Sequence, residues 1–328
     1  MAAEGSGSLD YFPENILLDI LSYLNVRDLL RAARVCKRWK RLIRDHRLWR
    51  RVDLTKCGVV NSRLLWLLVR RYLGAGLRVL CLRGLLFSVR NRALLSQPWL
   101  QALARQCPKL HCLILLHADL KEVGNYQRLP ASLKTLELIT CEVPGAFFHS
   151  SGVSSGIRIE TLVVENVSSF SDQHLKALGN WETLRRLELR DAFRVTEAGI
   201  RGCASGHLTQ LESLELGRKG RCSTQNERAA AGIAEGLPGL VELTLGGAEV
   251  LNGLPCLPRL ARLRSLRLQH SSLSPADLLP ACQEAPSLRS VVLSDVSFSS
   301  AADQDSIQQG LLHCAVTCVR CTARAVQS

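Results

Sequence analysis

Hydrophobic residues near the start of the chain recur at the spacing of short amphipathic helices. A first stripe has the i, i+1, i+4, i+5, i+8 spacing of one helix face: Ile16, Leu17, Ile20, Leu21 and Leu24. Pro13 suits the first helical turn, where a missing N–H costs little, and Asn25 is a typical N-cap for a second helix. A third stripe follows, with basic residues on its other side: Val35, Cys36, Trp39, Leu42 and Ile43. The pattern predicts three short helices between Phe12 and Trp49.

These helices together form a segment that is too small to bury its own apolar surface. Segments of about 40 residues usually need a metal, disulfides or a partner to be stable. Cys36 is the only cysteine in this segment, and no set of metal ligands accompanies it. The surplus apolar surface must therefore be covered either by the rest of the chain or by another protein.

A second pattern, L-x-x-L-x-L, recurs through the remainder of the chain. The hexamers follow one another at intervals of 23 to 33 residues and begin at Leu77, Leu110, Leu133, Ile159, Leu184, Leu211, Leu240, Leu263 and Leu288. This hexamer with a period in the twenties is typical of leucine-rich repeats. Each hexamer is predicted to be a short strand with its aliphatic side chains inside the repeat stack. Parallel strands about 4.8 Å apart and wider helical returns would bend the stack, with the strands on its concave side.

Two further segments complete the predicted fold. Residues 1–8 are small and polar and are predicted to be disordered, and Leu311–Arg320 is predicted to be a terminal strand that closes the stack. The fold class is therefore α/β: a short three-helix segment followed by a curved solenoid with a parallel sheet inside and helices outside.

Four groups of residues in the helical segment resemble the F-box motif: Phe12–Glu14, Ile20–Leu24, Val35–Trp39 and Leu48–Trp49. Family members usually have Leu in place of Phe12. The resemblance, together with the repeats, identifies the chain as a member of the F-box and leucine-rich-repeat family. It implies an F-box at 9–54 and a repeat domain at 55–328, with about nine to ten repeats and a C-terminal cap.

The resemblance also implies partners. F-box proteins dock onto the Skp adaptor, and through it onto the cullin and RING subunits of a ubiquitin ligase. Carried over residue by residue, the adaptor contacts would be Pro13, Ile16, Leu17, Ile20, Leu21, Leu24, Leu29, Val35, Cys36 and Trp39. Some of these residues are expected to pack inside the F-box instead.

The formal net charge of +13 is unevenly distributed. The segment from Leu54 to Ala118 contains no Asp or Glu, whereas the rest of the repeat region is nearly balanced. A basic block suggests an acidic partner, such as an acidic protein, an anionic surface or nucleic acid. No alternation of aromatic and basic residues supports nucleic acid. The block could also be an ordinary solvated face.

Composition argues against several other classes of protein. The first ten residues lack the features of a signal peptide, and no run of 18 apolar residues predicts a membrane span. The thirteen cysteines therefore suggest buried thiols in a reducing compartment, the cytoplasm or the nucleus. Alternation along a strand would place Cys318 and Cys321 on opposite faces, so this C-x-x-C motif predicts no metal site. The sequence predicts no cofactor and no catalytic residue.

The concave face is the predicted binding surface for a protein substrate. The residue between the last two aliphatic positions of each hexamer points out of the sheet, and a neighbouring row accompanies it. The candidate residues on these two rows are Ile114, Glu137, Val163, Arg186, Glu188, Glu215, Glu242 and Arg267. The acidic stretch predicts a substrate with a basic segment, although cross-strand pairs would explain the same residues.

The leading hypothesis is thus a non-catalytic substrate receptor of an Skp–cullin–F-box ubiquitin ligase. The alternative is a non-degradative repeat scaffold that binds an acidic partner or nucleic acid.

Overall fold

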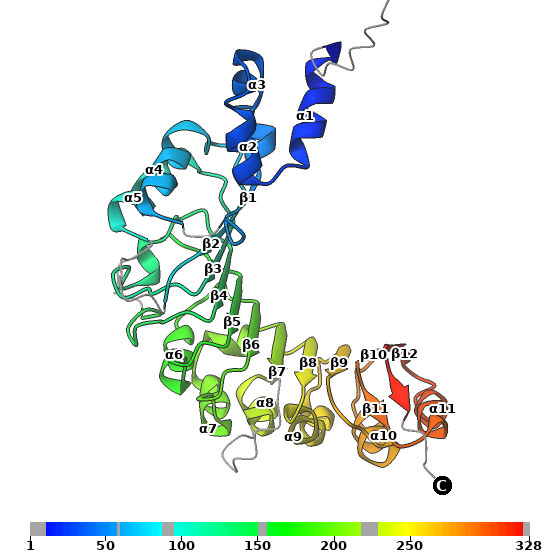
Figure 1. Cartoon of the computed structure of the whole chain (residues 1–328). Coiled ribbons are helices and arrows are strands. Elements are labelled where there is room, and N and C mark those ends of the chain that lie inside the picture. Colours follow the sequence, from blue (N-terminus) through cyan, green and yellow to red (C-terminus); the bar gives the residue numbers. More distant parts are fainter. Residues whose placement is uncertain (1–10, 58–59, 87–94, 150–155, 218–228, 324–328) are drawn as a thin grey trace, which may run out of the picture.

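Eleven short parallel strands form one continuous sheet that curves through the molecule (Figure 1). The computed structural model describes residues 11–57, 60–86, 95–149, 156–217 and 229–323, so the predicted disorder of residues 1–8 lies outside the described residues. The strands follow sequence order: β1 (Arg51–Asp53), β2 (Val79–Arg83), β3 (Cys112–Leu116), β4 (Thr135–Ile139), β5 (Thr161–Glu165), β6 (Arg186–Arg190), β7 (Ser213–Gly217), β8 (Glu242–Gly246), β9 (Ser265–Gln269), β10 (Ser290–Ser294) and β12 (Ala315–Val319).

All nine hexamers form strands, as predicted, and each strand begins two residues after the start of its hexamer. The pairing register is the same throughout β2 to β12, so that equivalent positions of successive repeats lie side by side. Ile114 of β3, for example, pairs with Glu137 of β4, and Glu137 pairs with Val163 of β5. The leucines of the hexamers are buried inside the stack.

The residue after a strand commonly has a left-handed backbone conformation. Its φ angle lies between 48° and 52° at His117, Thr140, Asn166, Asp191, His270, Asp295 and Arg320. Asn and Asp tolerate this conformation, whereas β-branched residues rarely adopt it, so Thr140 is an unusual case. The repeated left-handed residue turns the chain out of the sheet in the same way in successive repeats.

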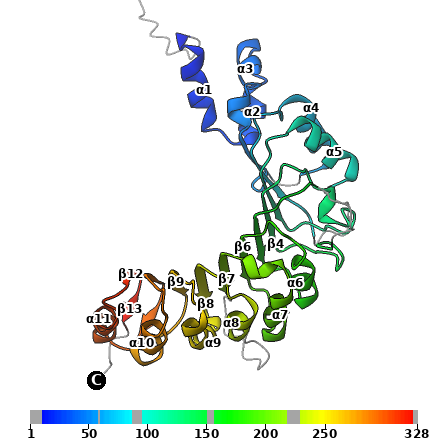
Figure 2. The same cartoon turned by 180° about the vertical axis from the view of Figure 1, so that it is seen from behind.

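Helices cover the convex side of most repeats (Figures 1 and 2). They are α4 (Ser62–Arg71), α5 (Gln97–Gln106), α6 (Asp172–Leu178), α7 (Glu197–Arg201), α8 (Ile233–Gly236), α9 (Glu249–Gly253), α10 (Pro275–Gln283) and α11 (Ala301–Gly310). Asn61 caps α4, and its Oδ1 accepts a hydrogen bond of 2.9 Å from the Leu64 N–H. The prediction of helical returns is confirmed for these repeats.

The prediction is wrong for the returns between β3 and β5. The first contains a short 3-10 turn at Tyr126–Arg128, and the described part of the second contains no helix. Aromatic side chains fill the space there: Tyr126 and Trp181 have ring centroids 4.5 Å apart, and Phe148 lies edge-on to Phe170 at 5.8 Å. Such rings bury enough apolar area to replace a helix.

The N-terminal helices α1 (Glu14–Ser22), α2 (Val26–Ala32) and α3 (Lys37–Leu42) confirm the three-helix prediction. Asn25 caps α2, accepting from the Asp28 N–H at 3.1 Å, whereas Pro13 precedes α1 as its N-cap residue. Trp49 is almost completely buried, donates from Nε1 to the Ile43 carbonyl at 2.6 Å, and packs against Tyr72 of the first repeat. The helices therefore share one core with the solenoid.

The opposite end of the sheet is β12, the strand predicted within Leu311–Arg320. Strand β11 (Ser297–Phe298) pairs with β13 (Thr322–Ala323) beside it. The expectation that Cys321 faces away from Cys318 is wrong, because the left-handed turn at Arg320 ends the alternation. Both cysteines are half-buried and pack against the core.

The described residues contain neither a disulfide nor a candidate metal site. The twelve cysteines within the described ranges are free thiols, and those ranges hold no cluster of His, Cys, Asp and Glu that could bind a metal ion. In the same ranges, no helix has the length and apolar character needed to cross a bilayer.

Candidate functional site

Helix α1 has two apolar faces, and the chain covers only one of them. Leu17 and Leu21 are buried in the core shared with the repeats. Ile16 and Ile20 of the helix, and Leu24 just after its end, keep 38%, 42% and 36% of their surface exposed. Apolar side chains that lie together on an open helix face form the type of surface at which proteins bind partners.

The ten predicted adaptor residues therefore divide into two groups. Leu17, Leu21 and Leu29 are buried in the chain's own core, so their side chains maintain the helices. The other seven are accessible at least in part, and their contact with an adaptor stays a prediction: Pro13, Ile16, Ile20, Leu24, Val35, Cys36 and Trp39.

Two arginines of α3 fix the position of α1. Arg38 donates from Nη2 to the Phe12 carbonyl at 2.6 Å, and Arg41 forms an ion pair with Glu14. The Cys36 Sγ caps α3 by accepting from the Trp39 N–H at 3.4 Å. These contacts hold the open face of α1 in a fixed orientation relative to α3.

On the concave face, the strand register brings like charges together. Glu188 of β6 and Glu215 of β7 are direct register partners, and both are mostly buried. Neighbouring carboxylates in a parallel sheet repel each other unless a cation lies between them.

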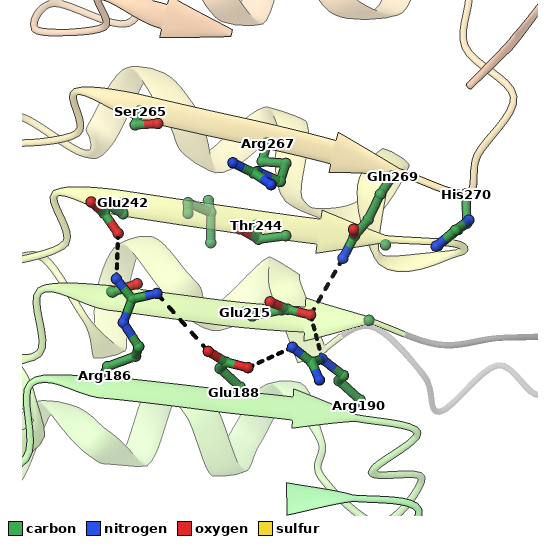
Figure 3. Close-up of a pocket in the computed structure, with 14 residues that line it drawn as sticks. Arg186, Glu188, Arg190, Glu215, Glu242, Thr244, Ser265, Arg267, Gln269 and His270 are labelled. Atoms are coloured by element: carbon green, nitrogen blue, oxygen red, sulfur yellow. Dashed lines mark hydrogen bonds and ion pairs between the residues drawn. The ribbon is translucent and has the colours of Figure 1, made fainter. Parts of the chain in front are cut away.

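Arg190 is that cation (Figure 3). Its guanidinium binds Glu215 through Nε at 2.6 Å, Glu188 through Nη2 at 2.6 Å and Glu165 through Nη1 at 3.3 Å. Arg186 binds Glu242 at 3.0 Å on the neighbouring row. Two arginines thus neutralise much of the acidic stretch.

Burial and the neighbouring charges of this network shift the pKa values of Glu188, Arg190 and Glu137. Burial raises the pKa of Glu188, and the charge of Arg190 opposes this effect. The hydrogen bond to Glu215 raises the pKa of Arg190, so the guanidinium stays charged. Burial, and then the charge of Glu188, raise the pKa of Glu137, which forms no ion pair with another described residue.

A hollow of about 490 Å³ lies over β6 to β9, next to this ion-pair network. Gly217 and Gly246, the last residues of β7 and β8, form part of its floor and are register partners. A Cβ at Gly217 would meet no atom within 4 Å, whereas a Cβ at Gly246 would lie 3.1 Å from the Cα of Gly217. Gln269 donates to Glu215 Oε1 at 3.3 Å at the edge of the hollow, close to His270 (Figure 3).

The structure brings five of the eight predicted substrate-site residues around this hollow: Arg186, Glu188, Glu215, Glu242 and Arg267. The other three lie on β3 to β5, outside its lining: Ile114, Glu137 and Val163. Cross-strand pairing accounts for Glu215 and Glu242, as the alternative explanation expected, whereas Glu188 pairs with Arg190 of its own strand. Among the described residues Arg267 has no ion-pair partner.

Sequence reasoning missed the central role of Arg190, as well as Gln269, His270 and the glycine floor. Arg190 is 25 residues from both Glu165 and Glu215, which is one repeat in each direction. That spacing was the available signal, because residues one repeat apart lie on neighbouring strands.

Comparison with known proteins supports the same architecture. Residues 9–55 match the F-box-like family. F-box/LRR-repeat protein 12 of Homo sapiens is 36% identical over 318 residues, which cover 94% of this chain and 95% of that protein. The protein of the same name from Mus musculus is 34% identical over 94% of this chain and 95% of its own length.

Solved structures with leucine-rich repeats are more distant. LegL7 of Legionella pneumophila is 16% identical, with a TM-score of 0.41 over 76% of this chain and 84% of that chain. The fold assignment therefore depends on the repeats and the sheet described above. Because the similarity to the human and mouse proteins spans nearly the whole of both chains, this chain belongs to the F-box/LRR-repeat protein family.

Proposed function

We propose that the chain is the substrate receptor of an Skp–cullin–F-box ubiquitin ligase. In this proposal the F-box (9–54) binds the Skp adaptor, which links it to the cullin and RING subunits, and the repeats (55–328) bind a protein substrate. The observation that carries the proposal is the open apolar face of α1, held in place by α3 and located within the F-box-like segment.

The receptor itself performs no chemistry in this proposal. It holds the substrate near the conjugating enzyme, which raises the effective concentration of substrate lysines. The shared core between the F-box and the first repeat supports this role, because a rigid connection fixes the distance between adaptor and substrate. We place this function inside the cell, in the cytoplasm or the nucleus, where thiols remain reduced.

The adaptor surface is tested with the triple variant Ile16→Ser, Ile20→Ser, Leu24→Ser. Full burial of such a side chain contributes about 1.5–3 kcal/mol, and each of these keeps over a third of its surface open. Their loss should cost about 2–3 kcal/mol of binding, or roughly 30- to 150-fold in affinity. Isothermal titration with purified adaptor measures the change.

A matched control carries Leu251→Ser and Leu312→Ser, two exposed leucines remote from the F-box. The control should bind the adaptor normally, and circular dichroism should show that both variants keep the helix content of the wild type. Adaptor affinity of the triple variant within twofold of wild type would contradict the proposal. Deletion of the whole F-box is a poorer test, because it would uncover the core around Trp49.

The concave face is the proposed substrate surface, with Glu137 as the residue for a basic group of the substrate. Reversing Glu188 or Glu215 would break the ties to Arg190 and disturb the sheet itself. Glu137→Gln and Arg267→Gln avoid this problem, since neither charge is in an ion pair of the described structure. Proteins captured by the wild type and lost with these variants would be substrates, whereas an unchanged set would exclude this face.

A further inference from the structure

A second hollow, of about 690 Å³, lies between α2 and the beginning of α4. In both views of the molecule, α2 lies between α1 and α4, so this hollow is separate from the open face of α1 (Figures 1 and 2). It is also remote from the concave hollow, which lies over β6 to β9. Its lining combines two kinds of residue.

The floor of this hollow is apolar. Val26 is buried, and Leu30 and Leu64 are half-buried and pack against the common core. Cys57 completes the floor, and burial raises the pKa of its thiol, so the neutral form is favoured. A floor of this kind gains free energy when apolar groups cover it.

The rim is cationic. Arg27, Arg31, Arg34 and Lys56 line the hollow, and all four side chains are exposed. Arg31 forms an ion pair with Asp28 at 3.2 Å. Within the described part of the chain, no acidic residue pairs with the other three. Positive charge around the apolar floor is therefore largely uncompensated.

The outer side of α4 repeats this combination. Arg63, Arg70 and Arg71 line a shallow hollow of about 450 Å³ together with Trp66 and Leu67. The Arg70 Cζ lies 5.1 Å from the centre of the Trp66 ring, over its face. Leu64 lines the first hollow, and its neighbour on α4, Arg63, lines the second. We therefore treat the two hollows as one surface that extends across the beginning of α4.

We propose that this surface, the α2–α4 shoulder, binds an acidic protein segment that also carries apolar residues. The excess of positive charge would attract and orient the acidic residues, and the apolar floor would bind the side chains between them. The hollow between α2 and α4 has the volume of an ordinary ligand pocket. Nucleic acid fits less well, since phosphates gain nothing from an apolar floor and Arg70 covers the ring of Trp66.

The test uses three fluorescent probes with the full-length chain. The first is a synthetic peptide of about fourteen residues with Glu and Asp between leucines at helical spacing. The second has the same charge but Ser in place of Leu, and the third is single-stranded DNA of similar charge. Fluorescence anisotropy should show at least roughly tenfold tighter binding of the first peptide than of either comparator.

The variant Arg34→Glu, Lys56→Glu should weaken binding of the first peptide at least roughly tenfold, because it reverses two charges of the rim. The matched control Arg262→Glu, Arg289→Glu makes the same charge change on exposed residues of the C-terminal repeats and should bind normally. Circular dichroism establishes that both variants fold. The triple serine variant of α1 should still bind the peptide, which separates this proposal from the adaptor proposal.

Three results would overturn the proposal. The first is equal binding of all three probes, which would indicate a general polyanion surface. The second is unchanged peptide binding by the Arg34→Glu, Lys56→Glu variant. The third is loss of adaptor binding in that variant, which would make the shoulder part of the adaptor interface.

Discussion

The ion-pair network of the concave face makes a quantitative prediction for Arg190→Met. The substitution keeps an apolar stem but removes the cation that Glu165, Glu188 and Glu215 share. Breaking a fully buried ion pair costs about 3–5 kcal/mol. Here the side chains keep 33% exposure at Arg190 and 15% to 23% at the glutamates, so we expect a loss of about 1.5–3 kcal/mol.

The pH dependence provides an independent check of the cause. Without the arginine, Glu188 loses the charge that favours its ionised form, and its pKa rises further above the ordinary value. The variant is therefore less stable where Glu188 is ionised, and its difference from the wild type should shrink as the pH falls toward the ordinary glutamate pKa of 4.5. Urea unfolding followed by circular dichroism at pH 7.5 and at pH near 4.5 measures both values.

Two further variants complete this experiment. Arg185→Met removes an exposed arginine beside the same strand, 3.8 Å from Glu212, and should cost less than about 0.5 kcal/mol. Adding Glu188→Gln and Glu215→Gln to Arg190→Met should restore much of the lost stability, because the repulsion disappears. The reasoning would be refuted if Arg190→Met were as stable as wild type at pH 7.5, or if the glutamines made it less stable still.

Other predictions concern packing and protonation. His174 is buried, with Nδ1 accepting from the Ser171 N–H at 3.2 Å, and burial lowers its pKa. The neutral imidazole therefore stabilises the fold above the ordinary pKa of 6.5, and this stabilisation is lost as the pH falls below that value. The loss amounts to at most about 1.4 kcal/mol of unfolding free energy per pH unit. In His174→Phe, the free energy of unfolding should no longer show this part of the pH dependence. A Cβ at Gly236 would lie 1.9 Å from the carbonyl oxygen of Ile200, so Gly236→Ala should cost about 1–3 kcal/mol in urea unfolding, and equal stability would show that the backbone shifts easily. Gly202, where a Cβ meets nothing within 4 Å, serves as the control, and Gly202→Ala should leave stability unchanged or raise it by up to about 1 kcal/mol.

The hexamer period was sufficient to predict the sheet, because a strand placed every 23 to 33 residues can stack only on the strand before it. The same period predicted which residues line the concave face. It could not predict how their charges pair, since Arg190 reaches diagonally to Glu215 rather than to its direct register partner, Gly217. That choice depends on side-chain length and local space.

The F-box shows a different limit of sequence reasoning. The stripe on α1 places Ile16 beside Leu17 and Ile20 beside Leu21, and both members of each pair are aliphatic. Hydrophobicity alone therefore cannot tell which member faces the chain's own core. Packing against α3 and the 3-10 turn at His46–Trp49 decides this, because the leucines are buried and the isoleucines stay open.

The uniform strand register determines which residues an extended segment can contact when it lies across the concave face. Neighbouring strands are about 4.8 Å apart and an extended chain advances about 3.3 Å per residue, so three residues span two strands. Every third residue of the segment would then contact every second strand, so it would meet one of two alternating sets of outward-facing residues. One set is Ile114, Val163, Glu215 and Arg267, and the other is Glu137, Glu188, Thr244 and Val292. A segment displaced by a single strand would exchange an apolar beginning and a cationic end for an acidic beginning and an apolar end.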